Sequence, residues 1–363
     1  MNIVFVGGGS LGPVTPLLAV IKALKRHGPR QLTCSWIGTP NGPEKMLIEA
    51  EGIKFFTLAV AKWPRYPSLG WITFPYQWLQ ARKMAKQLIE ALKPDAVITV
   101  GGFTAVPVIR VAAAKHIPCF AHQLDLEPGL ANRLIAQQCM SVTTSFEYEK
   151  RPFGERVSDE PLTTPMRYAH IALPTREAAV KAFGLDPHQS IVCVYGGGQG
   201  AHALNIFVER TLDVLLRFTQ IIHVTGQGKD THLQQRQRKG YVVRSLLSGE
   251  EMGRAHAAAD LEITRAGIGT LSEIAGLKKA ALIIPIPDTQ QEANAHAFEE
   301  RGAVMVFDQA SSTFDEDVVS SAKILLQDRS ERQAMGERAN AFFPTDDGTA
   351  FAKRILHHLA SRV

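Results

Sequence analysis

Cysteine is scarce in this sequence of 363 residues, which contains only Cys34, Cys119, Cys139 and Cys193. All four lie in apolar stretches of sequence, and their spacing matches no metal-binding pattern. We therefore expect reduced, buried thiols, as is usual in a cytosolic protein, rather than disulfides or a structural metal site.

Long apolar runs are also absent. A membrane-spanning helix needs roughly 18 uninterrupted apolar residues, and the most apolar region, residues 96–114, is interrupted by two glycines, a proline and an arginine. Residues 1–6 carry no charged segment or cleavage signature and run directly into glycines, so we predict a strand there rather than a signal peptide. With 45% hydrophobic and 21% charged residues, the composition is typical of a soluble globular protein.

Two halves of the chain open with the same pattern. The apolar run 2–6 enters the glycine turn 7–12, and the run 190–195 enters the turn 196–201; a helical pattern follows each turn. A strand, a glycine turn and a helix form the first unit of a doubly wound α/β domain. Further apolar strands alternate with helical segments, at residues 32–37, 96–100, 118–122, 221–224, 261–264 and 281–285. We predict an α/β fold with two doubly wound, parallel-sheet (Rossmann-like) domains that face each other across a cleft.

Proline-rich breaks suggest the domain boundaries. Residues 151–165 contain three prolines and little periodicity, so we interpret them as a linker. A second break at residues 342–348 precedes the last helix. The predicted division is an N-terminal domain of residues 1–163, a C-terminal domain of residues 164–344 and a final segment of residues 345–363.

Both glycine turns suit a ligand that carries phosphate, because glycine permits close backbone approach and a helix N-terminus presents unpaired N–H groups. Gly7-x-Gly9-x-x-Gly12 matches the dinucleotide fingerprint, which also requires a carboxylate at the end of the second strand. The second strands end at Gly38-Thr39 and Thr225-Gly226, where no carboxylate is present. Hydride transfer is therefore disfavoured, and the lack of Gly-Lys-Ser/Thr after either turn excludes a P-loop.

A carboxylate is present instead at a later turn of the C-terminal half. After the apolar run 261–264, residues 265–274 form another strand-to-helix turn, with Glu273 on the first turns of the helix. Glu273 can accept hydrogen bonds from ribose hydroxyls, or it can act as a capping carboxylate that stabilises the helix. Gln290 and Gln291 follow the next strand, at the sheet edge where α/β proteins bind ligands, and their amides suit sugar hydroxyls.

Residues 62–93 combine six basic residues with one acidic residue and hold three of the four tryptophans. Basic side chains with amphipathic aromatics suit an anionic membrane surface, although a core-facing helix with a solvated basic side has the same composition. The residues expected to contact the membrane are Trp63, Trp71, Trp78, Arg82 and Lys83. The basic residues form no strong stripe and no recognition motif is present, so we expect no nucleic-acid partner.

Seven motifs in order resemble the MurG family, the GT-B-fold N-acetylglucosaminyltransferases that complete the lipid-linked precursor of peptidoglycan. They cover nearly the whole chain, at residues 7–20, 94–103, 122–132, 164–167, 196–201, 269–273 and 290–295. The resemblance implies inverting transfer of N-acetylglucosamine from UDP-N-acetylglucosamine to undecaprenyl-diphosphate-linked N-acetylmuramyl-peptide (lipid I), giving lipid II, without a metal or other cofactor. It also implies peripheral attachment to the cytoplasmic face of the bacterial inner membrane, and a last helix that returns to the N-terminal domain.

The resemblance further assigns ligand contacts. Those implied for the donor are Ser10, Leu11, Gly12, Asp125, Arg167, Gly198, Gln199, Leu247, Ile268, Gly269, Thr270, Leu271, Ser272, Glu273, Gln290 and Gln291. Those implied for the acceptor diphosphate are Ser10, Gly12, Gly101 and Gly102. Arg167 would pair with the donor pyrophosphate, and Leu247 would lie near the uracil.

The chain departs from the family pattern at the first glycine turn, where Leu11 replaces a glycine and Pro13 replaces the histidine usually assigned to catalysis. Proline cannot accept a proton, and a general base contributes roughly 10²- to 10⁴-fold in rate. Asp125, where the family has asparagine, is our first candidate for the base, and His122 is the second. Two alternatives stay open: a GT-B enzyme with a different acceptor, and a non-catalytic relative that binds nucleotide sugars.

Overall fold

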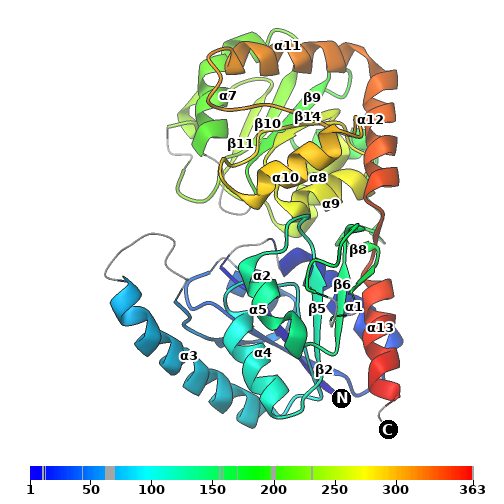
Figure 1. Cartoon of the computed structure of the whole chain (residues 1–363). Helices are drawn as coiled ribbons and strands as arrows, with labels where there is room; N and C mark the ends of the chain where they lie inside the picture. Colours follow the sequence, from blue (N-terminus) through cyan, green and yellow to red (C-terminus); the bar gives the residue numbers. More distant parts are fainter. Residues whose placement is uncertain are drawn as a thin grey trace. The chain divides into compact units, whose positions relative to one another are not determined.

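The computed structural model describes residues 1–9, 12, 14–42, 44–61, 70–154, 157, 159–169, 171–197, 202–229 and 232–361. The chain divides into two compact units (Figure 1). Unit 1 comprises Met1–Arg167 and Asp346–Val363, and unit 2 comprises Tyr168–Thr345. Each unit contains one parallel β-sheet with helices packed against it, which confirms the predicted pair of doubly wound α/β domains.

The sheet of unit 1 has seven strands in the order β3-β2-β1-β4-β5-β6-β7. Their bounds are β1 (Asn2–Val6), β2 (Thr33–Gly38), β3 (Lys54–Thr57), β4 (Ala96–Thr99), β5 (Cys119–Gln123), β6 (Ser141–Thr144) and β7 (Asp159–Pro161). The helices of this unit are α1 (Val14–His27), α2 (Glu44–Ala50), α3 (Gly70–Leu92), α4 (Ala105–Ala114), α5 (Leu130–Ile135) and α13 (Thr349–Ala360), with the short 3₁₀ helix η1 (Ala136–Gln138). Each neighbouring pair of strands runs parallel.

The sheet of unit 2 repeats this topology with six strands, in the order β11-β10-β9-β12-β13-β14. Their bounds are β9 (Ile191–Tyr195), β10 (Gln220–Val224), β11 (Tyr241–Arg244), β12 (Leu261–Thr264), β13 (Ala281–Ile283) and β14 (Met305–Val306). The helices are α6 (Arg176–Ala182), α7 (His202–Leu215), η2 (Gln234–Arg236), α8 (Gly249–Ala258), α9 (Ile268–Gly276), α10 (Gln290–Glu299), α11 (Phe314–Gln327) and α12 (Arg329–Phe342).

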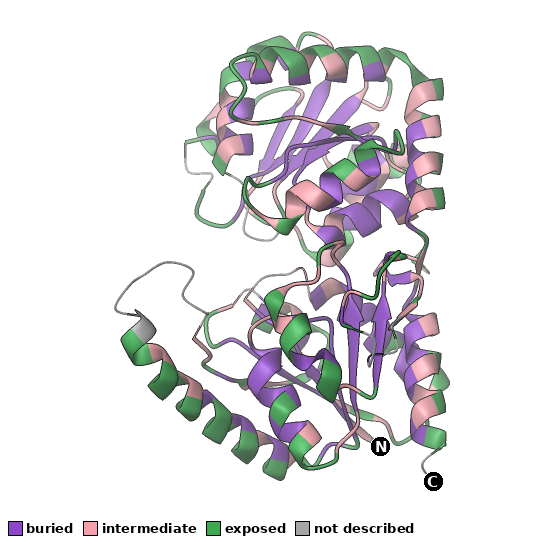
Figure 2. Cartoon of the chain, viewed as in Figure 1, coloured by how far each residue is buried: buried purple, intermediate pink, exposed green. Residues whose placement is uncertain are grey.

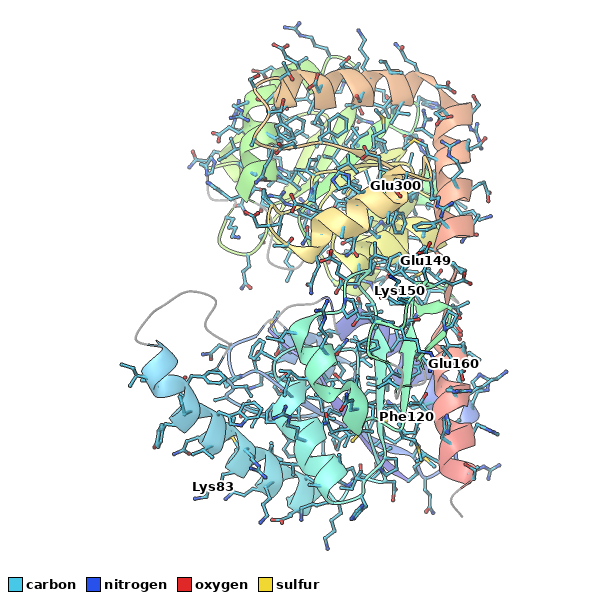
Figure 3. All side chains as sticks on the ribbon, viewed as in Figure 1. Lys83, Phe120, Glu149, Lys150, Glu160 and Glu300 are labelled. Carbon is cyan, nitrogen blue, oxygen red and sulfur yellow. The ribbon has the colours of Figure 1, made fainter. Side chains whose placement is uncertain are left out.

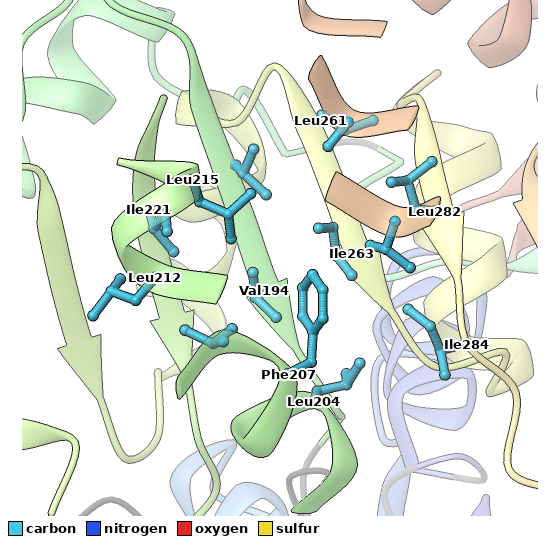
Figure 4. Close-up of a cluster of buried hydrophobic side chains, with 14 of the residues drawn as sticks. Val194, Leu204, Phe207, Leu212, Leu215, Ile221, Leu261, Ile263, Leu282 and Ile284 are labelled. Atoms are coloured by element: carbon cyan, nitrogen blue, oxygen red, sulfur yellow. The ribbon is translucent and has the colours of Figure 1, made fainter. Parts of the chain in front are cut away.

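The central strands are buried on both faces (Figure 2), which explains why they are almost continuously apolar in sequence. In unit 2 the largest hydrophobic cluster joins β9, β12 and β13 to α7, and Phe207 of α7 lies among Val194, Ile263 and Leu204 (Figure 4). Burial of apolar surface of this kind stabilises a fold by about 25 cal/mol per Å².

We expected the proline-rich segment 151–165 to be a linker, but part of it forms strands. Residues 159–161 form β7, which pairs with β6 at the edge of the sheet of unit 1, and Thr164–Pro165 form the short strand β8. A proline can occupy such an edge strand because one side of the strand has no ladder hydrogen bonds to lose. Further along the chain, β15 (Thr345–Asp346) pairs with β8.

Helix α3 lies at the periphery of unit 1 and presents one largely exposed face (Figure 2). We expected Trp78 to point outward with the basic residues, but it does not. It packs, partly buried, against the core of unit 1, with Phe74 stacked at 6.4 Å between ring centroids and the Arg110 guanidinium 5.7 Å from the ring. Trp63 and the side chain of Trp71 lie outside the described residues, whereas Arg82 and Lys83 are exposed.

Within the described ranges, no helix combines the length and apolar character needed to span a bilayer. All four cysteines are free. Cys119 and Cys193 are buried, whereas Cys34 and Cys139 are only partly buried.

Helix α13 packs against α1 of unit 1, although it follows unit 2 in the sequence. Asp346 accepts hydrogen bonds from the N–H groups of Gly348 (2.9 Å) and Ala350 (2.7 Å), Asp347 forms an ion pair with Arg26, and Phe351 is fully buried. Arg354 of α13 forms an ion pair of 2.5 Å with Glu160 of β7, which Figure 3 shows beside α13.

Gly348 allows α13 to begin this close to α1. Its φ is +83°, and a Cβ atom there would lie 2.6 Å from the backbone nitrogen of Val20. We expect Gly348→Ala to destabilise the protein by about 2 kcal/mol or more, because strain of the left-handed backbone adds to a clash with helix backbone.

Gly52→Ala is the matched control, because Gly52 has a φ of +69° but nothing within 4 Å of its added Cβ. It should show only the backbone strain, about 1 kcal/mol. Urea unfolding of both variants measures the difference. Equal loss of stability in the two variants would contradict the packing role of Gly348.

Candidate functional site

Each sheet reverses its strand order beside its first strand. In unit 1 the chain moves outward from β1 through β2 to β3, and then returns to the other side of β1 with β4; unit 2 does the same around β9 and β12. Parallel α/β sheets bind ligands at the carboxyl ends of the strands that flank such a reversal. The candidate site in each unit is therefore the edge formed by the loops after these two strands.

In unit 1 the loops after β1 and β4 approach each other closely. Gly9 has a φ of +85°, and a Cβ atom there would lie 2.7 Å from the Phe103 ring. Gly101 has a φ of +109°, and its Cβ would lie 2.7 Å from Oδ1 of Asn132. Gly102 also has a positive φ, of +94°. Gly101 and Gly102, two of the glycines predicted for the acceptor, therefore occupy positions that a larger residue would strain.

Ser10, Leu11 and Pro13 lie outside the described residues, and Gly12 is described in a turn. Glu44, at the start of α2, is a buried group at this edge that was not among the predicted residues. Its Oε1 accepts hydrogen bonds from the Thr39 N–H at 2.7 Å, from the Thr39 hydroxyl and from the Gly9 N–H at 3.3 Å. Glu44 therefore ties the glycine turn after β1 to the loop after β2.

Asp125 follows β5, at the same edge of the sheet of unit 1, and is half-buried. Its backbone carbonyl accepts hydrogen bonds from the Gln123 amide at 2.7 Å and from the Tyr148 hydroxyl at 3.2 Å. The side-chain Oε1 of Gln123 in turn accepts a hydrogen bond from the Asn132 amide at 2.6 Å. These bonds fix the backbone that carries the Asp125 carboxylate, next to the residues that contact Gly101.

The surroundings of His122 are typical of a buried structural residue and not of a general base. The ring is fully buried, with Nδ1 2.8 Å from the Thr143 hydroxyl and Nε2 3.0 Å from the Ser145 hydroxyl. Burial lowers the pKa of His122 to about 3. The ring therefore joins β5 to β6 as a neutral group, and our second candidate for the base is not supported.

In unit 2, Gly196 and Gly197 follow β9, whereas Gly198 and Gln199 lie outside the described residues. The loop after β12 leads directly into α9, with Gly267 as its N-cap. The first N–H groups of a helix have no partner within it and favour an anion. The side chains of Ile268 and Leu271, which were predicted to contact the donor, are buried and apolar, so their backbone N–H groups are the polar groups they offer to it.

The remaining predicted donor residues lie at or near the same edge. Thr270 and Gly269 are half-buried on the first turn of α9, and the Ser272 hydroxyl donates to the Gly269 carbonyl at 2.7 Å. Gln290 is exposed at the start of α10. The Oε1 atom of Gln291 accepts a hydrogen bond from the Ile286 N–H at 3.2 Å.

Leu247 packs, partly buried, against a second hydrophobic cluster of unit 2. Arg167 is the last residue of unit 1 before the chain enters unit 2. Arg265, which was not among the predicted residues, is buried directly after β12. Its guanidinium donates to the carbonyls of Ile284 and Pro285 at 2.8 and 2.9 Å, and so joins the loop after β12 to the loop that leads into α10, where Gln290 and Gln291 lie.

Glu273 belongs to a buried ionic cluster that sequence analysis also missed. His256 of α8 lies between two carboxylates, with Nδ1 2.8 Å from Glu262 of β12 and Nε2 3.3 Å from Glu273 of α9. The Tyr195 hydroxyl donates to the other oxygen of Glu262 at 2.7 Å. Burial on its own lowers the pKa of His256, but Glu262 and Glu273 outweigh that effect and raise the pKa to about 9. His256 is therefore an imidazolium at neutral pH.

Among the residues that the structure describes, no group of three or more His, Cys, Asp or Glu side chains is arranged to hold a metal ion. The chemical groups present at the two edges are backbone N–H groups, amides, hydroxyls and carboxylates. Such groups suit a ligand that combines phosphate with sugar hydroxyls.

Both halves of the chain match domains of one family. Residues 3–144 match the N-terminal domain of glycosyltransferase family 28, and residues 191–352 match its C-terminal domain. Together with the two parallel-sheet units, these matches define the chain as a GT-B glycosyltransferase, and by its reaction type as a hexosyltransferase.

Two relatives indicate which glycosyltransferases of this family the chain resembles. A protein of Clostridium botulinum (strain Loch Maree / Type A3) is 35% identical over 312 residues, which are 84% of this chain and 85% of the relative. A protein of Lachnospira eligens is 33% identical over 336 residues, 90% of this chain and 92% of the relative. Both are named UDP-N-acetylglucosamine--N-acetylmuramyl-(pentapeptide) pyrophosphoryl-undecaprenol N-acetylglucosamine transferase.

The crystal structure of Acinetobacter baumannii MurG aligns with 98% of this chain and 99% of its own, at 25% identity and a TM-score of 0.72. The chain belongs to the MurG family, as the seven motifs predicted.

The raised pKa of His256 makes the stability of the fold depend on pH. The pKa in the folded state, about 9, lies above the ordinary value of 6.5, so the stabilisation is complete below about pH 6.5 and is lost as the pH rises through about 9. We expect the free energy of unfolding to fall between about pH 7 and pH 10, and to fall less in His256→Gln.

Urea unfolding across this pH range measures the effect. His296→Gln is the control, because His296 is exposed on α10 and pairs only with Glu299 of the same helix among the ion pairs of the described residues. The control variant His296→Gln should lose as much stability between about pH 7 and pH 10 as the parent protein does. The same pH dependence in all three proteins would show that His256 is not the group responsible.

Proposed function

We propose that this chain transfers N-acetylglucosamine from UDP-N-acetylglucosamine to lipid I, the undecaprenyl-diphosphate-linked N-acetylmuramyl-pentapeptide, and so forms lipid II for peptidoglycan synthesis. The observation that carries this proposal is its similarity, at 35% identity over 84% of the chain, to relatives named for that reaction. The glycine turns and helix N-termini at both sheet edges support it, because they suit the diphosphates of both substrates.

Unit 1 is proposed to receive the acceptor and unit 2 the donor. In unit 1 the acceptor diphosphate would meet the turn that includes Ser10 and Gly12, and the loop Gly101–Gly102. In unit 2 the pyrophosphate of the donor would meet Gly198 and Gln199, with Arg167 as its charged partner. The first turn of α9 and Glu273 would bind the diphosphate and ribose, and Gln290 and Gln291 the sugar hydroxyls.

The proposed reaction is a single displacement that inverts the anomeric centre. An acceptor hydroxyl oxygen forms a bond to C1 of N-acetylglucosamine while the bond from C1 to the UDP oxygen breaks. The hydroxyl proton passes to a general base, and UDP leaves with the electron pair of the broken bond. Backbone N–H groups at the start of α9 and the Arg167 guanidinium stabilise the charge that develops on UDP.

UDP release from the purified protein tests the function directly. The protein is given UDP-N-acetylglucosamine with and without a lipid I analogue, and we expect release that depends on the acceptor. UDP-N-acetylglucosamine binding without such release would contradict the transferase function, and would favour a different acceptor or a non-catalytic nucleotide-sugar-binding protein.

Asp125 is the proposed general base, because it carries a titratable group at the carboxyl edge of unit 1. We expect Asp125→Asn to lower kcat by about 10²-fold or more, since the amide cannot take the acceptor proton. Glu127→Gln is the control, because Glu127 is an exposed carboxylate two residues further along the same loop. Turnover of Asp125→Asn within a few-fold of the parent would exclude Asp125 as the base.

The proposed localisation is the cytoplasmic face of the bacterial inner membrane, with an anionic lipid surface as the partner of α3. Ile72, Tyr76 and Leu79 share one face of this helix and are 76%, 66% and 61% exposed. Lys83 and Lys86 continue the same face, and Figure 3 labels Lys83 on α3. A helix with exposed apolar residues beside lysines suits an anionic bilayer surface.

Leu79→Glu should weaken binding to vesicles that contain anionic lipid by about tenfold or more, because it removes apolar surface and adds repulsion. Ile324→Glu is the matched control, since Ile324 is an equally exposed residue (62%) on α11 of unit 2. Vesicle flotation measures both variants. Equal binding by the two variants would exclude α3 as the membrane contact.

A further inference from the structure

The buried cluster of unit 2 connects the proposed ribose-binding carboxylate to the strands beneath it. Its members come from β9, β12, α8 and α9, the elements that surround the reversal of strand order. The chain of contacts runs from the Tyr195 hydroxyl to Glu262, from Glu262 to His256, and from His256 to Glu273. The side chains of His256 and Glu262 are fully buried, and that of Glu273 is 7% exposed.

Each ring nitrogen of His256 faces a carboxylate oxygen, and an imidazolium, which donates from both nitrogens, satisfies both contacts. A neutral imidazole has one N–H donor and one acceptor, so one of the two carboxylates would face a lone pair. The ring is also fixed from its sides, with the edges of Tyr168 and Tyr195 at 5.6 and 5.8 Å between ring centroids. The direction of its Nε2–H bond is therefore set by packing and by Glu262.

The contact with His256 accounts for the position of Glu273 in α9, which helix capping does not explain. Glu273 is the sixth residue of α9, too far along the helix for its carboxylate to be a cap of the first N–H groups. Instead, Glu273 accepts a hydrogen bond from His256, a residue of another helix. A long carboxylate side chain would otherwise sample several rotamers, and it would lose that freedom when it binds a ligand.

We propose that His256 is a positioning residue for the donor: it holds the Glu273 carboxylate in the orientation that accepts hydrogen bonds from the ribose hydroxyls of UDP-N-acetylglucosamine. The proposal rests on the donor-binding role proposed for Glu273. Glu262 and Tyr195 fix His256, and His256 fixes Glu273, so affinity for the nucleotide depends on a residue that does not touch it.

Two substitutions of His256 separate its two contacts. The amide nitrogen of asparagine falls near the position of Nδ1, so His256→Asn keeps a donor for Glu262 and loses the contact with Glu273. The amide nitrogen of glutamine falls near the position of Nε2, so His256→Gln keeps a donor for Glu273. We expect His256→Asn to weaken UDP binding by about tenfold, the size expected for one well-oriented hydrogen bond, and His256→Gln to restore most of the affinity.

The ligand supplies the second control. Binding of UDP and of 2′,3′-dideoxyuridine diphosphate, which lacks both ribose hydroxyls, is measured by calorimetry for the parent, His256→Asn, His256→Gln and Glu273→Gln. His256→Asn should weaken binding of UDP but leave that of the dideoxy nucleotide within about twofold. In turnover it should raise the KM for UDP-N-acetylglucosamine about tenfold while kcat stays within about twofold.

The outcomes distinguish the two proposals. If Glu273→Gln leaves UDP affinity unchanged, the donor site itself is wrong. If Glu273→Gln weakens binding but His256→Asn does not, the positioning role is wrong and the donor site stands. Equal weakening of UDP and the dideoxy nucleotide in His256→Asn would also overturn the positioning role, because it would indicate general damage to unit 2.

Discussion

The reversal of strand order beside β1 and beside β9 is the constraint on which the rest of the structure depends. At these points the helices that follow the two neighbouring strands leave toward opposite faces of the sheet, so their loops separate and leave the carboxyl edge open. Because the faces of such a sheet are covered by helices, a polar ligand reaches it at the strand ends. The glycine turns, the loop after β4 and the start of α9 all lie where this constraint places them.

Each unit also buries carboxylate side chains beneath its open edge, and their hydrogen-bond partners differ between the two units. Glu44 of unit 1 accepts hydrogen bonds from backbone N–H groups and from a threonine hydroxyl. Glu262 and Glu273 of unit 2 share the positive charge of His256. A buried carboxylate is costly unless it is paired or hydrogen-bonded. Each set of contacts therefore favours one arrangement of the surrounding loops.

Much of the fold follows from local patterns in the sequence. Apolar runs that enter glycine turns predicted the first strand of each unit, and the seven motifs predicted the family. The seventh strand of unit 1 escaped notice because it is three residues long and ends in Pro161. The orientation of Trp78 was open to prediction, since Ala81, Ala85 and Ile89 recur at helical spacing on the same buried face of α3.

The candidate site was harder to predict than the fold. Gly101 and Gly102 were assigned through the family resemblance, and both have a positive φ that suits glycine. The contacts of His256 could not be predicted from sequence, because a histidine, a glutamate in the next strand and a glutamate in the next helix meet only after three elements have packed. His122 shows the opposite case, in which a polar residue that looks catalytic in sequence forms hydrogen bonds that join two buried strands.

The return of α13 to unit 1 has a consequence for the order of events during translation. Unit 2 is one continuous stretch of chain, Tyr168–Thr345, and its residues emerge from the ribosome together. Unit 1 is discontinuous, and the helix that covers α1 and contacts β7 is synthesised only after the whole of unit 2. The usual order, in which the N-terminal domain of a nascent chain is completed first, is therefore reversed here. The surface of α1 that α13 later covers stays accessible to chaperones while unit 2 is being made.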